Sequence, residues 1–264
     1  MLFLISPAKS LDYETRVPAA VLRHASEPAY LDQAAELIAL MRKKTPTQVA
    51  ALMELSPALA ELNVARYAAW SREHAGPSAK PAVLAFDGDV YGGLNAKTLT
   101  TADLRWAQEH LVILSGLYGA LRPLDWLQPY RLEMGTTLAN PRGRDLYAFW
   151  GDTVAEQLNA RQADEAKPVV VNLASIEYAR VALRKSLRAR VVDCVFEDWK
   201  GDDYKIISFF AKRARGLMAR WAVQHRVRSV KKLEAFTAEG YTLDHSASAA
   251  DRLVFRRRVD EVGT

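Results

Sequence analysis

The amino-acid sequence predicts an α/β protein in which helices surround a sheet of mixed strand direction. Short apolar runs of strand length alternate with longer segments whose apolar residues recur every three to four positions, the spacing of an amphipathic helix. No internal repeat, low-complexity tract or clear linker interrupts the 264 residues, and half of them are hydrophobic. A chain of this length can bury a substantial core, so we expect a single α/β domain over residues 1–264.

Several elements can be placed in order along the chain. Strands are predicted where apolar runs end in turn or polar residues, and helices where the three-to-four spacing is sustained. The expected strands cover residues 2–5, 83–86, 110–114, 169–175, 191–196, 205–209 and 252–256. The expected helices cover residues 30–44, 101–109, 145–158 and 178–187, and a further helix starts at Phe210. Residues 200–203 (Lys-Gly-Asp-Asp) are expected to join two of the strands as a hairpin.

Residues 45–67 carry two helix-start signals. Thr45 precedes Pro46 and Ser56 precedes Pro57, so each pair places an N-cap before a proline at the first helical position. The segment therefore predicts two helices joined by a tight turn, a possible helix-hairpin-helix element. The backbone amides that begin its second helix can bind a phosphate. The turn lacks the glycines of the usual DNA-binding hairpin, which favours simple helix packing as the alternative.

The segment from Tyr204 to Leu233 is strongly basic. It contains nine of the 36 lysine and arginine residues and no aspartate or glutamate. An ordinary surface helix intersperses acidic residues for pairing, so we expect one face of this helix to pack on the core and the other to bind a polyanion. A solvated helix face is the alternative. The basic residues are Lys205, Lys212, Arg213, Arg215, Arg220, Arg226, Arg228, Lys231 and Lys232.

Two loops that follow predicted strands are further candidates for binding. Lys9 and Ser10 come just after the first strand, where α/β folds commonly place ligand contacts. Arg122 and Arg131 lie in a long loop after the third strand, behind a Gly-x-x-Gly turn that can let a phosphate approach closely (residues 116–119). The alternative for Lys9 and Ser10 is a plain exit from the strand. The alternative for Arg122 and Arg131 is an ion pair within the loop, with Asp125 and Glu133 respectively.

The composition restricts the class of protein. The single cysteine, Cys194, lies in an apolar run, which excludes an internal disulfide and fits a reducing compartment. The apolar start of the chain is too short for a signal peptide or a membrane span. Asp87 and Asp89 are spaced for a hard cation but lack the later ligands of a calcium loop, and the five histidines show no ligand spacing. We therefore expect a cytoplasmic protein with no membrane contact, metal, cofactor or stable protein partner.

An enzymatic role is the second hypothesis. Five polar residues lie just past predicted strands and can converge on one pocket, where they would act on a nucleotide or on damaged DNA. No Walker loop, Gly-x-Gly-x-x-Gly, His-Glu-x-x-His or Gly-x-Ser-x-Gly motif is present, which favours a non-enzymatic protein. Direct iron storage is a third hypothesis, and it lacks the Glu-x-x-His pairs of a di-iron bundle. The catalytic candidates are Lys9, Tyr118, Arg131, Asn172 and Ser175.

Four runs in the same order resemble the bacterial YaaA family of peroxide stress resistance proteins. They cover residues 5–9, 114–125, 129–135 and 209–220. The resemblance implies a cytosolic protein that limits free iron and oxidative DNA damage under hydrogen peroxide. It also implies a family-specific α/β fold with a helix-hairpin-helix element and a positively charged cleft that binds double-stranded DNA. The expected DNA-binding residues are Lys9, Ser10, Arg122, Arg131, Lys205, Lys212, Arg213, Arg215 and Arg220.

Overall fold

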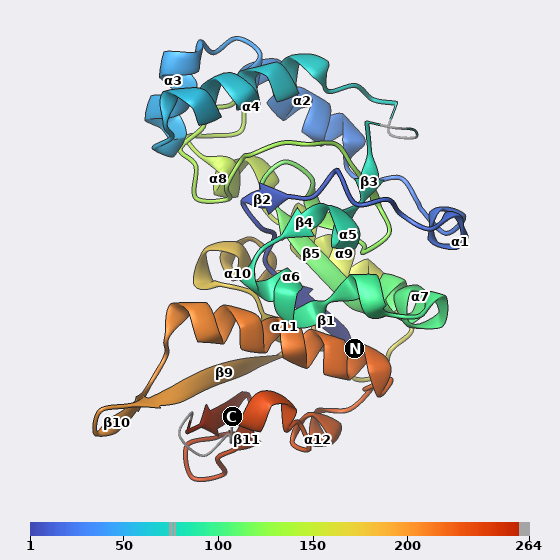
Figure 1. Cartoon of the computed structure of the whole chain (residues 1–264), viewed down its shortest axis with the longest axis vertical. Coiled ribbons are helices and arrows are strands. Elements are labelled where there is room, and N and C mark those ends of the chain that lie inside the picture. Colours follow the sequence, from blue (N-terminus) through green and yellow to red (C-terminus); the bar gives the residue numbers. More distant parts are fainter. Residues whose placement is uncertain (74–75, 77, 259–264) are drawn as a thin grey trace.

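Parallel strands form the centre of the molecule, and helices surround them (Figure 1). A computed structural model describes residues 1–73, 76 and 78–258. The strands of the main sheet are β1 (Leu2–Ile5), β5 (Leu111–Ser115), β6 (Gly119–Leu121), β8 (Val169–Leu173), β9 (Arg190–Lys200), β10 (Asp203–Lys205), β11 (Thr242–Leu243) and β12 (Arg252–Arg257). Their order is β11-β12-β9-β8-β1-β5-β6, and β10 pairs with β9 outside this path.

Strand direction in this sheet is mixed, as predicted. The inner strands β12, β9, β8, β1 and β5 are parallel to their neighbours, whereas β6, β10 and β11 pair antiparallel at the margins. All residues of β1 and β5 are buried. A parallel strand covered on both faces must be apolar throughout, which is why these strands are continuous apolar runs in the sequence.

The helices form groups around the sheet (Figure 1). The α-helices are α1 (Ala19–Leu22), α2 (Leu31–Met41), α3 (Pro46–Met53), α4 (Pro57–Ala69), α5 (Ala82–Ala85), α6 (Asp89–Leu94), α7 (Thr101–His110), α8 (Leu146–Trp150), α9 (Thr153–Arg161), α10 (Ile176–Ala182), α11 (Ser208–Gln224) and α12 (Val230–Leu233). Two 3₁₀ turns are η1 (Ala96–Thr98) and η2 (Ala238–Gly240). Helix α11 packs against β1, β8 and β9 and against α6 and α7, and α10 packs against α8 and α9.

Two small strand pairs lie beside the main sheet. They are β2 (Ser10–Leu11) with β4 (Phe86–Asp87), and β3 (Lys80–Pro81) with β7 (Trp126–Leu127). Asp12 directly follows β2, and its carboxylate lies 2.6 Å from the ammonium of Lys97 and 3.4 Å from that of the buried Lys80. The Lys97 ammonium, followed by the backbone amide of Thr15, holds the pKa of the Asp12 carboxyl well below its usual range. These contacts hold β2, which begins at Ser10, and the loop before it that carries Lys9.

The two helices predicted within residues 45–67 are present as α3 and α4. The Thr45 hydroxyl accepts a hydrogen bond from the Gln48 amide at 3.3 Å, and the Ser56 hydroxyl accepts one from the Leu59 amide at 3.4 Å. Glu54 ends α3 in the left-handed conformation, with φ of 52°. The role of this helix pair in DNA binding stays a prediction.

Four predicted elements were wrong in type or extent. Residues 83–86 were expected as a strand, but α5 and the short β4 occupy them. The prediction failed because a short apolar run looks the same in the sequence whether it forms a buried helical turn or a strand. Residues 205–209 were also expected as a strand, but β10 ends at Lys205 and α11 begins at Ser208. The helix expected over residues 145–158 is split into α8 and α9 at Gly151, whose φ is 48°. Helix α10 covers only part of the range expected for it.

Helices α6 and α11 approach each other closely at two glycines. A Cβ atom on Gly216 would lie 1.8 Å from the carbonyl oxygen of Val90, and one on Gly93 would lie 2.2 Å from the carbonyl oxygen of Arg213. Both obstacles are backbone atoms, which cannot move aside as a side chain can. The contact therefore fixes the position of α11 relative to α6.

Replacing Gly216 with alanine should destabilise the protein by about 2 kcal/mol, because the helices must separate to admit the methyl group. Urea unfolding measures the change. Gly92→Ala on α6 is the matched control, because the nearest atom to its Cβ, on the flexible Arg213 side chain, is 3.8 Å away. We expect that control to be neutral or slightly stabilising. Equal losses in both variants would contradict the close-contact explanation.

Candidate functional site

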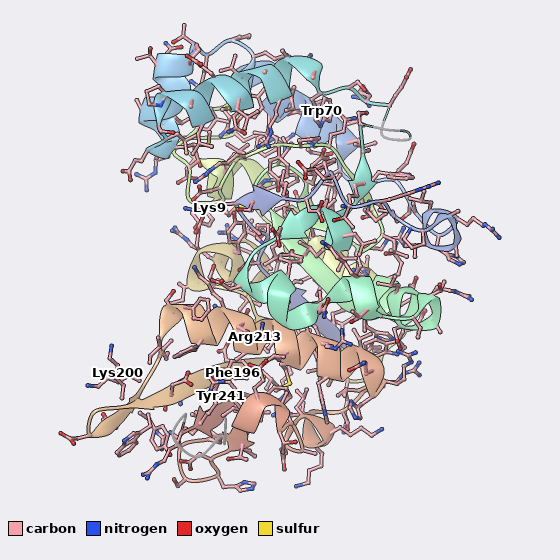
Figure 2. The ribbon with its side chains drawn as sticks, viewed as in Figure 1. Lys9, Trp70, Phe196, Lys200, Arg213 and Tyr241 are labelled. Atoms are coloured by element: carbon pink, nitrogen blue, oxygen red, sulfur yellow. The ribbon has the colours of Figure 1, made fainter. Side chains whose placement is uncertain are left out.

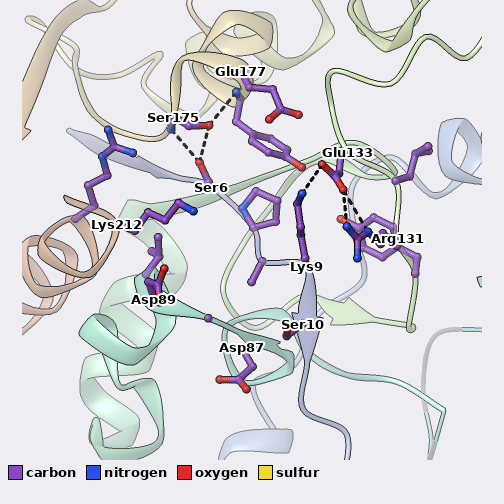
Figure 3. A pocket seen from close by; sticks show the side chains of 18 residues that line it. Ser6, Lys9, Ser10, Asp87, Asp89, Arg131, Glu133, Ser175, Glu177 and Lys212 are labelled. Atoms are coloured by element: carbon purple, nitrogen blue, oxygen red, sulfur yellow. Dashed lines mark hydrogen bonds and ion pairs between the residues drawn. The ribbon is translucent and has the colours of Figure 1, made fainter. Parts of the chain in front are cut away.

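A cavity of about 440 Å³ opens where β1 and β8 end (Figure 3). These strands are parallel neighbours, so the residues that follow them reach the same edge of the sheet. In the sheet, β1 lies between β5 and β8; the chain that leaves β1 forms β5 on one side of it first and β8 on the other side later. Ligands of α/β proteins commonly bind at such a switch point, outside the carboxyl ends of the strands. We call this hollow the strand-end cavity; it is lined by residues 6–10, 87–90, 130–133, 175, 177, 178, 212 and 215.

Two serines join the ends of the strands. The Ser175 amide donates to the Ser6 hydroxyl at 2.9 Å, and the two hydroxyls are 3.3 Å apart. Ser175 is also the N-cap of α10, where its hydroxyl accepts from the Tyr178 amide at 3.5 Å. The Tyr91 hydroxyl donates to the Ser6 carbonyl oxygen at 3.1 Å. These bonds fix the floor of the cavity.

One wall is a charged cluster built around Glu133. Lys9 Nζ lies 3.1 Å from one carboxylate oxygen, and Arg131 donates to the other from Nε at 3.2 Å and from Nη2 at 3.0 Å (Figure 3). The Tyr67 hydroxyl donates to the carbonyl oxygen of Arg131. Lys9 remains 64% exposed, so its ammonium can still reach a ligand.

The opposite wall comes from α11. Lys212 and Arg215 are three residues apart, which places both on the helix face that borders the cavity. Neither makes an ion pair with a described residue. Burial lowers the pKa of Arg215, because the half-buried guanidinium has lost water without gaining a carboxylate.

The cavity also contains carboxylates. Glu133 is held by two cations, and Glu177 accepts a hydrogen bond from the Gly135 amide at 2.9 Å. Asp87 and Asp89 flank Gly88, whose φ is 156° and whose Cβ position lies 3.2 Å from the Ala8 side chain. Among the described residues, no group of three or more His, Cys, Asp or Glu side chains is placed to hold a metal ion. His74 lies outside them.

Two buried phenols complete the lining. Burial raises the pKa of Tyr130 and of Tyr178 well above the ordinary value for tyrosine. Both stay protonated at neutral pH, so they act as hydrogen-bonding groups and not as general bases. The Tyr130 hydroxyl lies 2.6 Å from that of Ser115, the last residue of β5.

The structure brings only some of the predicted site residues to this cavity. They are Lys9, Ser10, Arg131, Ser175, Lys212 and Arg215. Asn172 instead donates to the Asp193 carboxylate at 2.8 Å, and Tyr118 is fully buried and accepts from the Trp70 indole. Arg122 borders a different hollow beside the buried Asp125, and Lys205 is exposed at the end of β10.

Three cations of the basic segment pair with carboxylates of the protein itself, which the absence of acidic residues within the segment did not indicate. Arg213 pairs with Glu239, Arg226 with Asp103 at 2.7 Å, and Lys231 with Glu234 at 2.7 Å. Arg220 donates to two backbone carbonyl oxygens at the end of α6, at 3.0 and 2.9 Å. Figure 2 shows Arg213 on α11 and Lys9 on a separate segment above it. All three carboxylates lie outside the basic segment, so the composition of that segment did not reveal them.

The Gly-x-x-Gly turn does not offer its backbone to a ligand. Gly116 and Gly119 are buried, and a Cβ on Gly116 would lie 2.2 Å from the Leu132 carbonyl oxygen. A Cβ on Gly119 would meet the Trp150 ring at 2.7 Å. These glycines let other parts of the same chain approach, and Gly116 thereby places the segment that carries Arg131 and Glu133.

Sequence reasoning missed several residues of the cavity. Ser6 and Glu177 were not considered as site residues, and Glu133 was considered only as an ion-pair partner. Their signals were weak, since a serine after a strand and a glutamate in a first helical turn are common. Asp87 and Asp89 were noted only as possible cation ligands.

The fold and the cavity define an α/β protein with a charged, ligand-sized hollow at the carboxyl ends of its parallel strands. A family model described as peroxide stress protein YaaA matches residues 1–247. The chain belongs to this family. It is 66% identical to a UPF0246 protein of Leptothrix cholodnii over 257 residues, which cover 97% of this chain and 98% of that protein. It is 62% identical to a UPF0246 protein of Polaromonas naphthalenivorans over 257 residues (97% and 98%) and 58% identical to one of Bordetella avium over 260 residues (98% and 100%).

Within the part of the chain that the structure describes, the helices are too short or too polar for any of them to cross a membrane.

Proposed function

We propose that this chain binds double-stranded DNA without sequence preference, through the strand-end cavity and its rim. In the peroxide stress response of its family, this binding would help to limit free iron and oxidative DNA damage in the cytoplasm. The observation that carries the proposal is that Lys9, from the start of the chain, and Lys212 and Arg215, from α11, border one cavity.

The charges of the cavity favour a phosphate on the α11 side. Among the described residues, Lys212 and Arg215 have no ion-pair partner, whereas Lys9 and Arg131 already share Glu133. A phosphate oxygen would give the half-buried Arg215 guanidinium the anion that its surroundings do not supply. Ser10 and the exposed Lys205 are the further residues through which we expect the backbone to be contacted.

Binding of this kind should depend steeply on salt. If about six phosphates are neutralised, the affinity for a duplex should fall roughly a thousandfold between 50 and 200 mM salt, because each contact releases condensed counterions. Fluorescence anisotropy with a labelled duplex measures this, and single-stranded DNA and RNA of equal length serve as comparisons. An affinity that salt leaves unchanged would contradict backbone binding.

A second candidate is an enzyme that acts on a nucleotide or on damaged DNA in the same cavity. The observation that favours it is the pairing of cations and carboxylates in a hollow of about 440 Å³, a size typical of small-ligand sites. In a crystal soaked with a nucleoside monophosphate, the phosphate should then lie within hydrogen-bonding distance of Lys9. A cavity without electron density for the nucleotide, after soaking at millimolar concentration, would count against this candidate.

A further inference from the structure

A second concentration of positive charge lies at the opposite edge of the main sheet, where β1, β8 and β9 begin. Lys167 precedes β8, Arg188 precedes β9, Arg190 is the first residue of β9, and Arg228 precedes α12. These four side chains line a hollow of about 540 Å³ together with Met1. We call them the amino-edge patch. Unlike the strand-end cavity, this hollow has no carboxylate among its lining residues.

The patch is built by the strand register. Val169 of β8 is the partner of Arg190 in β9, which brings the two strand starts side by side. Arg190 pairs with Asp251 at 2.6 Å. Lys167, Arg188 and Arg228 are exposed and make no ion pair with any described residue. Three unpaired cations around one hollow repel one another, and an external polyanion would relieve that repulsion.

The alternative is that these exposed side chains are surrounded by water alone. Their arrangement instead fits a chain of phosphates. They come from three separate segments and line one hollow. Two nearby carboxylates are already engaged, since Glu165 pairs with the terminal ammonium of Met1 and Asp251 with Arg190. The patch therefore keeps a net positive charge of the kind that binds a nucleic-acid backbone.

We propose that the amino-edge patch is a second, weaker site for the phosphate backbone of duplex DNA, so that one chain can hold two duplexes. The inference rests on the proposed function, because it assigns the first duplex to the strand-end cavity. The two sites lie at opposite ends of the same parallel strands, and β8 alone separates them by roughly 16 Å along its five residues. A duplex bound at one edge therefore leaves the other edge open.

The test is the capture of one duplex by another. A biotinylated duplex is fixed to beads, the protein is added at 50 mM salt, and recruitment of a second, fluorescent duplex is measured. The protein should recruit it. The variant Lys167→Glu/Arg188→Glu should stay bound to the fixed duplex through the strand-end cavity but recruit at least tenfold less of the second. Arg16→Glu/Arg23→Glu is the control, because it makes the same change of net charge at exposed side chains that lie in neither site.

The outcomes separate the two proposals. A patch variant that recruits as much as the unaltered protein would overturn the second site, and would point to bridging by association of two protein chains. An unaltered protein that holds the fixed duplex but recruits nothing would also overturn it, while leaving the first proposal standing. A protein that fails to hold even the fixed duplex would overturn both.

Discussion

Replacing Lys212 and Arg215 together with glutamate should weaken the binding of a short duplex about a hundredfold at 100 mM salt. The change removes two phosphate contacts and adds like charge at the same wall of the strand-end cavity, and charge-assisted contacts to phosphate are among the stronger hydrogen bonds. The slope of log affinity against log salt concentration should become shallower by about two, because two fewer phosphates are neutralised. The weak binding that remains would come from the amino-edge patch.

Two controls make this result interpretable. Arg16→Glu/Arg23→Glu has the same net charge and should bind nearly as well as the unaltered protein. Arg213→Gln on the same helix should also have little effect, because that guanidinium already pairs with Glu239 and does not line the cavity. Thermal unfolding checks that the double variant is folded. A folded Lys212→Glu/Arg215→Glu protein with undiminished affinity would exclude this wall of the cavity from DNA binding.

Replacing Asp198 with alanine should destabilise the protein by about 3–5 kcal/mol. Asp198 lies in β9 opposite Arg257 of β12 and is fully buried, and it accepts from Arg257 Nε and from the Tyr241 hydroxyl, both at 2.7 Å. The Arg257 guanidinium also lies 4.3 Å from the Tyr241 ring centroid. Removing the carboxylate leaves a mostly buried cation and a buried hydroxyl without this acceptor. Figure 2 shows Tyr241 close to Phe196 below α11, in the part of the core that this pair supports.

Urea unfolding measures this loss, and Asp251→Ala is the matched control. Asp251 also pairs with an arginine, Arg190, but its side chain is 65% exposed, so we expect a loss below about 1 kcal/mol. If Asp198→Ala does not fold, Asp198→Asn retains the shape of the side chain and should show a smaller loss. Equal losses at the buried and the exposed aspartate would refute the argument from burial.

The sequence predicted the elements that depend on local pattern. The continuous apolar runs of β1, β5 and β8 and the capped helices α3, α4 and α7 lie close to their expected positions. Pattern reasoning failed where a short segment takes its conformation from its surroundings. The amides of Ala82 and Val83 in α5, for example, donate to the carbonyl oxygens of Asp125 and Pro123.

The candidate site was also predicted only in part, because local pattern places a residue along the chain but not beside residues from distant segments. Lys9 could be placed after one strand and Ser175 at the end of another, and parallel strands bring their carboxyl ends together whatever the loops do. Lys212 was expected to bind the same DNA as Lys9, but local pattern did not place Glu133 or Lys212 beside it, since both reach the cavity through the packing of distant segments.

The sequence by itself determined the α/β class, the family and the unusual concentration of cations in one segment. Only the tertiary structure decided which of those cations lack an anion. Arg213 and Arg226 are neutralised by carboxylates from residues 239 and 103, whereas Lys212 and Arg215 line the cavity and make no ion pair with a described residue. The reason is physical: electrostatic pairing depends on distance in space, and folding sets that distance independently of separation along the chain.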